Sequence, residues 1–152
     1  MKAKDIMVAD FPVIPASTPI EEAVHILRSS HDESYLHASP GLIVVNDKGD
    51  LAGILSPLTI VRVLLDVAAE VENVSPGGKP SLDALCSRIK GKTVEDVMDW
   101  QPISVTEDAH ILDVADLFVK NRFQRIPVVK GKKVIGIIFR SRLLFFMTQC
   151  FD

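Results

Sequence analysis

The chain has 152 residues, of which 47% are hydrophobic and 24% are charged, so it can bury a core as one compact unit or as two small subdomains. Its formal net charge of −3 at pH 7 argues against a nucleic-acid-binding protein, which would carry a basic excess. The apolar runs are far shorter than the roughly 20 residues of a membrane span, and residues 1–10 hold no apolar signal-peptide core. We therefore expect a cytoplasmic protein that does not enter a membrane.

The first half begins with the tripeptide Asp-Ile-Met at residues 5–7. It then predicts an extended segment, an amphipathic helix, two buried strands joined by a tight turn, and a closing helix, at residues 12–14, 20–28, 42–45, 51–55 and 58–70. Thr18 is predicted to be the N-cap of the first helix, with Pro19 at its first helical position.

Two segments have no counterpart elsewhere in the chain. Residues 31–40 contain an insertion of eight residues between the first helix and the strand that follows it. Residues 74–80 are rich in proline and glycine and predict a loop. A short helix from Leu82 to about Lys90 should follow, with Ser81 as its N-cap and Gly91 ending it.

The second half repeats the first. Asp-Val-Met at residues 96–98 answers residues 5–7, and the same order of elements is predicted at 103–105, 111–120, 126–129, 134–138 and 140–151. The fold should be α/β, with two β-α-β-β-α repeats packed with pseudo-twofold symmetry. We expect a first repeat at 1–72, a connector with a short helix at 73–92, and a second repeat at 93–152.

This pattern resembles the CBS (cystathionine-β-synthase) domain family over almost the whole chain. The resemblance rests on the two Asp-hydrophobic-Met tripeptides, the Ile-Pro-Val-Val strand at 126–129, and the Gly-Ile strands at Gly53 and Gly136. It implies a CBS pair, or Bateman module, whose repeats leave two clefts between them. Such clefts hold AMP, ADP, ATP or S-adenosylmethionine as ligands of a regulatory module, without catalysis, metal or resident cofactor.

The family's nucleotide motif is glycine, two hydrophobic residues, Thr or Ser, two variable residues and Asp, and its carboxylate takes both ribose hydroxyls. In the first half, Ser56 stands at the hydroxyl position and Thr59 replaces the carboxylate. In the second half, Phe139 and Arg142 stand at these positions. Losing one charge-assisted hydrogen bond costs about 1.5–3 kcal/mol, or roughly tenfold to a hundredfold in affinity.

Arginines offer a different way to hold an anion. Arg140 and Arg142 open the last helix, and Arg125 precedes the 126–129 strand on the expected cleft rim. These three guanidinium groups could bind a phosphate-rich or carboxylate ligand through charge. The alternative is that they are solvated or pair with Asp113 and Asp116. The resemblance and these patterns together give the candidate ligand-binding residues Ile14, Ser56, Thr59, Val105, Arg125, Ile126, Pro127, Phe139, Arg140 and Arg142.

The histidines, cysteines and tryptophan were considered as metal ligands, redox groups and ligand contacts. His25, His31 and His37 are six residues apart, which is not the spacing of a helical metal-ligand pair, and no catalytic constellation is readable. Cys86 and Cys150 are expected to be reduced thiols. Trp100 is either a packing anchor or a residue that stacks on a ligand.

The helices that close the two repeats are strongly apolar, so they are either core or a dimer surface. Together with the resemblance, they predict a homodimer, with a separate effector protein as a further partner. A purely structural dimerisation module with degenerate clefts remains the alternative function.

Overall fold

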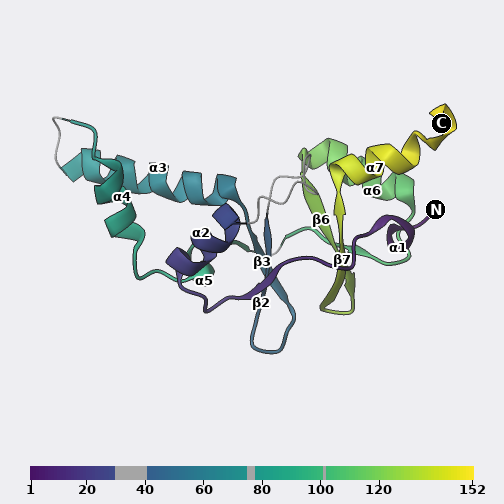
Figure 1. Ribbon diagram of the computed structural model, residues 1–152, viewed down its shortest axis with the longest axis horizontal. Helices are drawn as coiled ribbons and strands as arrows, with labels where there is room; N and C mark the ends of the chain where they lie inside the picture. The colour runs from purple at the N-terminus through teal and green to yellow at the C-terminus, as the bar shows by residue number, and fades with distance from the viewer. Residues whose placement is uncertain (30–40, 75–77, 101) are drawn as a thin grey trace.

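The computed structural model describes residues 1–29, 41–74, 78–100 and 102–152, which form two α/β lobes side by side along the long axis of the molecule (Figure 1). The first lobe contains β1 (Val13–Pro15), α2 (Ile20–Ser29), β2 (Leu42–Val45), β3 (Leu51–Leu55) and α3 (Pro57–Val74). The second contains β5 (Val105–Thr106), α6 (Ile111–Asn121), β6 (Arg125–Lys130), β7 (Lys133–Phe139) and α7 (Arg140–Met147). The predicted α/β fold with two β-α-β-β-α repeats is confirmed.

Several element boundaries differ from those predicted. Helix α2 begins at Ile20, one residue after Pro19, and the Thr18 hydroxyl donates a hydrogen bond to the Pro15 carbonyl oxygen at 2.7 Å. Helix α3 continues to Val74, whereas α7 ends at Met147 and is followed by a short 3-10 turn, η2 (Gln149–Phe151). Such shifts are small, because the hydrophobic periodicity fixes an element better than it fixes its ends.

The two sheets have matching topology. Strand β1 runs parallel to β2, which is antiparallel to β3, and β5, β6 and β7 are arranged in the same way. Each sheet packs one face on its own hydrophobic core, in which Val44 and Val128 are fully buried. The first sheet has a fourth strand, β4 (Asp99–Trp100), which pairs with β3 and was not predicted.

The segments that carry the Asp-hydrophobic-Met tripeptides each form a short helix, and each crosses to the lobe of the other repeat. Helix α1 (Ala3–Ile6) lies beside α7 in the second lobe, whereas α5 (Val94–Val97) lies in the first lobe (Figure 1). The backbone hydrogen bonds that hold α1 in the second lobe and α5 in the first are equivalent in the two repeats. Ala3 N–H donates to the Ala109 carbonyl at 2.8 Å, and Val94 N–H donates to the Thr18 carbonyl at 2.9 Å.

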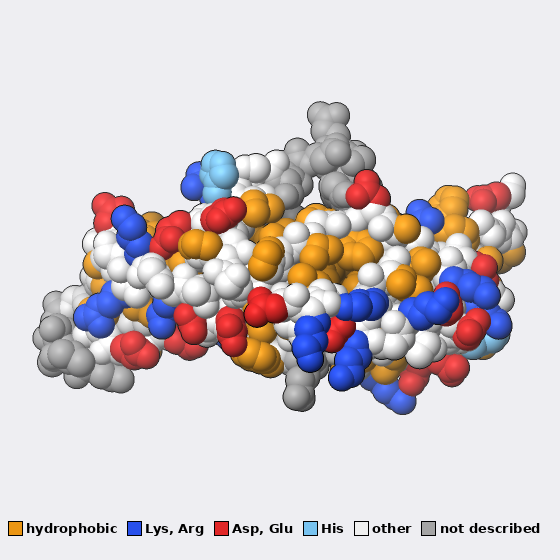
Figure 2. Space-filling view, turned by 90° about the horizontal axis from the view of Figure 1, so that it is seen from below, with side chains coloured by type: hydrophobic (Ala, Val, Ile, Leu, Met, Phe, Trp, Pro, Cys, Tyr) orange, Lys and Arg blue, Asp and Glu red, His pale blue; other side chains and the backbone are white. Residues whose placement is uncertain are grey.

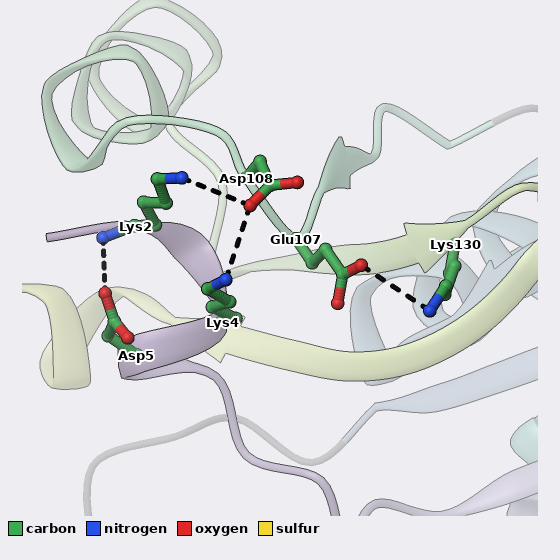
Figure 3. Close-up of polar contacts among 6 residues, drawn as sticks. All are labelled: Lys2, Lys4, Asp5, Glu107, Asp108 and Lys130. Carbon is green, nitrogen blue, oxygen red and sulfur yellow. Dashed lines mark hydrogen bonds and ion pairs between the residues drawn. The ribbon is translucent and has the colours of Figure 1, made fainter.

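Ion pairs strengthen the first of these crossings. The ammonium groups of Lys2 and Lys4 lie 3.3 and 3.4 Å from Asp108 Oδ1, in the loop between β5 and α6 (Figure 3). Asp5 accepts a hydrogen bond from the Lys2 backbone N–H at 2.8 Å, just as Asp96 accepts one from Thr93 at 2.9 Å. The aspartate of each tripeptide therefore caps its own helix, because it satisfies an otherwise unpaired N–H.

The methionines of the tripeptides explain the two strand glycines. A Cβ atom on Gly53 would lie 2.6 Å from Met98 Sδ, and one on Gly136 would lie within 3.0 Å of Met7 Cγ. Each methionine thus packs where the strand has no side chain. The tripeptide and glycine motifs therefore form two equivalent contacts, one between Met98 and Gly53 and one between Met7 and Gly136.

Helix α4 (Leu82–Ile89) packs within the first lobe, and the two hairpin turns make a contact between the lobes. The helix is capped by Ser81 as predicted, and its Leu85 and Ile89 pack on Val67 of α3. The β2–β3 and β6–β7 turns meet, with Lys133 Nζ 2.9 Å from Asp50 Oδ1.

On the face seen from below, hydrophobic side chains fill the centre and charged side chains of both signs surround them (Figure 2). Within the described ranges, no helix has the length and apolar character to cross a membrane.

Candidate functional site

A cleft of about 510 Å³ lies between the two lobes. Its walls come from three places: the end of β3 with the start of α3, the crossing segment after α5, and the loop between α6 and β6. The lining residues are Ile54, Ser56, Leu58, Arg62, Asp99, Pro102, Ile103, Asn121, Arg122, Phe123, Gln124 and Arg125. The cleft is of the size at which proteins bind small organic ligands.

Ser56 and Thr59 form the hydroxyl-rich start of α3. The Thr59 backbone N–H donates to Ser56 Oγ at 3.3 Å, and the two hydroxyl oxygens are 3.0 Å apart. Ser56 therefore has the position of an N-cap, which satisfies one of the unpaired N–H groups of the first turn. Thr59 is only 2% exposed, and it does not line the cleft.

The Thr59 hydroxyl is used to hold a carboxylate. Its Oγ1 donates to Asp99 Oδ2 at 2.9 Å, and Arg62 Nη1 donates to Asp99 Oδ1 at 3.2 Å. Asp99 comes from β4, which reaches α3 only because the α5 segment crosses to the first lobe. Its side chain is 48% exposed and lines the cleft. A carboxylate is thus present beside the position at which the sequence motif lacks one.

Arg122 and Arg125 supply positive charge from the second lobe. Arg122 ends α6 in the left-handed conformation, with φ of 54°, and is exposed. Arg125 is 8% exposed at the start of β6, and this burial lowers the pKa of its guanidinium group. Together with Arg62 they place three guanidinium groups around one cleft that also contains an acid.

The three arginines predicted for one cleft are not brought together. Arg125 lines the cleft, but Arg140 and Arg142 do not. Arg142 Nε donates to the Ile6 carbonyl at 2.7 Å, and its guanidinium carbon lies 5.2 Å from the centre of the Phe146 ring. Arg142 therefore stabilises the end of α1. Arg140 is exposed at the start of α7, and Phe139 is the residue before that helix.

The candidate residues on the short strands lie in the interior. Ile14 and Val105 are 5% and 8% exposed, Ile126 is fully buried, and Pro127 is buried within β6. None of these four lines the described cleft. Ile14 and Val105 are the buried residues of β1 and β5, and every residue of β6 except Lys130 is buried.

Sequence reasoning did not find Arg62, Asp99 or Arg122. Arg62 lies one helical turn after Thr59, so helical spacing alone could have placed it on the same side of α3. Arg122 had no comparable signal. Asp99 could not be found, because nothing local indicates that it crosses to a hydroxyl 40 positions earlier in the chain.

The histidines, cysteines and tryptophan singled out in the sequence lie outside the cleft lining or outside the described residues. Of the histidines that the spacing argument set aside as metal ligands, His31 and His37 lie outside the described residues. Within the described residues, no group of three or more histidine, cysteine or acidic side chains could hold a metal ion. Cys86 and Cys150 are exposed free thiols. Trp100 is 59% exposed on β4 and is not part of the cleft lining.

The predicted alternative for the arginines was that they are solvated or pair with Asp113 and Asp116, and Arg140 is indeed exposed. Asp116 instead pairs with Lys120, with 2.7 Å between Oδ2 and Nζ.

Sequence comparison places the chain among known proteins. Residues 3–66 and 94–148 match the family described as the CBS domain. CBSX2, a chloroplastic CBS domain-containing protein of Arabidopsis thaliana, is 28% identical over 143 residues, which cover 87% of this chain and 56% of CBSX2. The uncharacterised protein MJ1426 of Methanocaldococcus jannaschii is 35% identical over 103 residues, covering 66% of this chain and 56% of MJ1426. The chain therefore spans a little more than half of these relatives.

Solved structures share the fold along nearly the whole chain. CBSX2 in complex with AMP gives a TM-score of 0.73 at 24% identity, covering 99% of this chain and 98% of that one. A CBS domain-containing protein of unknown function from Kribbella flavida gives 0.71 at 29% identity, with 98% and 99% covered. The CBS domain pair of MJ0100, in complex with 5′-methylthioadenosine and S-adenosyl-L-methionine, gives 0.66 at 22% identity, with 97% and 96% covered.

Proposed function

The chain belongs to the CBS domain family, and on that premise we propose that it is a regulatory, non-catalytic module that binds a small ligand in the cleft between its repeats. The observation that carries this proposal is the 510 Å³ cleft, because residues from both repeats line it. A ligand that contacts α3 on one side and the α6–β6 loop on the other stabilises one relative packing of the lobes. Differential binding of this kind can change the dimer or a bound effector protein.

The chemistry of the lining favours an adenosyl nucleotide or another small anion. Arg62, Arg122 and Arg125 offer N–H donors that suit phosphate or carboxylate groups. Ile54, Leu58 and Ile103 offer apolar surface for a flat base. CBSX2 with AMP and MJ0100 with S-adenosyl-L-methionine are proteins of the same fold with ligands of this class, which supports the assignment.

A thermal-shift titration with AMP, ADP, ATP, S-adenosylmethionine and tripolyphosphate tests the proposal. A ligand at 100 times its dissociation constant stabilises the fold by about 2.7 kcal/mol, which raises the melting temperature measurably. Arg122→Gln should weaken the shift, whereas Arg140→Gln, an exposed arginine outside the cleft lining, serves as the matched control. A shift with tripolyphosphate alone would assign the cleft to simple anions.

The absence of any shift would favour the second candidate, a purely structural dimerisation module. The observation behind this candidate is Thr59, which replaces the motif carboxylate and is 2% exposed, so it offers a ligand nothing directly.

The proposal includes a homodimer formed through α3 and α7. Both helices lie on the same side of their sheets (Figure 1), and both expose large apolar side chains. Val61 and Leu65 are 51% and 65% exposed on α3, and Leu144 and Phe145 are 65% and 60% exposed on α7. A second copy can cover both helices at once, because pseudo-twofold repeats present two similar faces.

Sedimentation velocity tests the dimer. Leu65→Glu should convert the dimer into a monomer because it puts a charge in the buried interface. Leu82→Glu, on the exposed face of α4, is the control and should leave the dimer intact. A wild-type monomer at all concentrations would contradict this part of the proposal.

A further inference from the structure

The exposed apolar side chains of α3 and α7 form two short rows of similar length. On α3, Leu58, Val61 and Leu65 are 66%, 51% and 65% exposed, and their spacing of three and four residues puts them on one side of the helix. Beyond Leu65, α3 packs on α4 through the buried Val67. The exposed row of α3 is therefore about two turns long, and it matches α7, a helix of eight residues on which Leu144 is exposed.

The charges beside the two rows are opposite in sign. Helix α3 has three exposed acids, Asp66, Glu70 and Glu72, against a single arginine, whereas α7 has two arginines and no acid. Asp66 directly follows the exposed row of α3. Arg140 precedes Leu144 by four residues, so the two lie on the same side of α7. Any contact that buries these rows therefore also brings the charges of the two helices together.

A closed dimer can join these helices in two ways. In a head-to-head dimer, α3 faces the partner's α3 and α7 faces the partner's α7, so acids meet acids and arginines meet arginines. In a head-to-tail dimer, α3 of each copy faces α7 of the other, so acids meet arginines twice. Both arrangements have twofold symmetry and bury the same apolar rows. The charges decide between them, because like charges across an interface oppose association and opposite charges favour it.

We propose that two copies of this chain pair head to tail, with α3 of each copy packed on α7 of the other. The inference rests on the homodimer proposed above, to which it adds the orientation of the two copies. It also concerns the cleft, because Leu58 and Arg62 of α3 line it. The start of α3 is then shared by the bound ligand and the second lobe of the partner, so ligand binding and dimer formation affect each other.

The two native cysteines provide the labels for a test, because each lobe holds one. Cys86 is on α4 and Cys150 is in η2, and both are exposed free thiols. These two elements lie at opposite ends of the long axis (Figure 1). Cys150→Ser leaves only Cys86 for labelling, and Cys86→Ser leaves only Cys150.

Förster energy transfer between labelled copies of the full chain measures the orientation. A donor on Cys86 of one copy and an acceptor on Cys150 of another should give strong transfer in the mixed dimer. Mixtures in which both copies are labelled at Cys86, or both at Cys150, should give weak transfer, because a head-to-tail dimer separates identical residues. The reverse pattern would show a head-to-head dimer and overturn the inference. Equal transfer in all mixtures would show no preferred orientation and overturn it as well.

A charge reversal tests the physical cause, because the two arrangements predict opposite signs. In a head-to-tail dimer, Asp66→Lys adds a positive charge where the partner's arginines lie, so the dimer dissociation constant from sedimentation velocity should rise several-fold. In a head-to-head dimer, the same variant relieves the excess of acids between the two α3 helices, and the constant would fall. Asp83→Lys, at an exposed acid of α4 in the same lobe, is the matched control and should leave the constant unchanged. A constant that falls or stays the same for Asp66→Lys would overturn the inference.

The outcomes separate the orientation from the dimer itself. If the wild type sediments as a monomer and no mixture gives transfer, the proposed homodimer and this inference both fail. If the wild type is a dimer without the expected pattern of transfer, the homodimer stands and only its orientation is wrong.

Discussion

Gly41 and Arg125 occupy equivalent positions in the two repeats, each directly before a buried apolar strand run, and they touch each other. A Cβ atom on Gly41 would lie 2.6 Å from the Cζ and Nη1 atoms of Arg125. Equivalent positions can meet only near the pseudo-twofold axis, so the guanidinium group lies close to that axis. The absence of a side chain at Gly41 makes room for the large side chain at Arg125.

We expect Gly41→Ala to destabilise the fold by about 1–3 kcal/mol, because Arg125 is buried and cannot move away freely. Urea unfolding measures the change. In an Arg125→Ala background the same substitution should cost much less, since its clash partner is gone. Equal costs in both backgrounds would show that the contact is not the cause.

The two strand glycines should differ in their tolerance of alanine. The three atoms nearest to a Cβ on Gly136 all belong to the Met7 side chain, whereas a Cβ on Gly53 lies 2.7 Å from the Asp99 backbone oxygen. Gly53→Ala should therefore lower the melting temperature more than Gly136→Ala does. It should also weaken AMP binding, because it displaces Asp99. Identical effects of the two substitutions would argue against this difference in their neighbours.

Arg142 should matter for stability and not for ligand binding. Arg142 donates a hydrogen bond to the carbonyl oxygen of Ile6, which is fully buried. Arg142→Gln would leave that oxygen without its donor, so it should cost about 1–3 kcal/mol in unfolding free energy. The dissociation constant for AMP should stay the same by calorimetry. A weakened affinity at unchanged folding would instead restore the arginine cleft that the sequence suggested.

The turn contact predicts an acid-sensitive contribution to stability. A hydrogen bond from Lys133, with the charges of Lys132 and Lys48, lowers the pKa of Asp50 below its usual 3.8. Because the pKa is lower in the folded state, the contribution is present above about pH 4 and is lost as the pH falls through the folded value. The contribution of Asp108 to stability has the same pH dependence, because Lys2 and Lys4 lower the pKa of Asp108.

NMR titration of the Asp50 carboxyl checks this contribution. Lys133→Met should raise the pKa of Asp50 towards 3.8, and it should reduce the fall in the urea midpoint between about pH 5 and pH 3. Lys120→Met, which breaks an ion pair elsewhere, controls for the loss of one positive charge. An unchanged Asp50 pKa would show that Lys133 is not the cause of the shift.

Sequence alone predicted the elements that depend on local pattern. Period-3.6 and β-branched runs gave the helices and paired strands of both repeats, and Ser81 marked the start of α4. The internal repeat then predicted the pseudo-symmetric α/β fold. These features depend on neighbouring residues, so the linear chain already contains the information.

The tertiary structure alone decided which segment meets which sheet. The two Asp-hydrophobic-Met tripeptides look like the openings of their own repeats, yet α1 packs in the second lobe and α5 in the first. Nothing in the sequence of these tripeptides indicates which sheet each one packs on. That path also brings Asp99 to Thr59 and turns Arg142 towards Ile6. The acid of the cleft and the role of each arginine therefore follow from packing between distant segments, which no local pattern records.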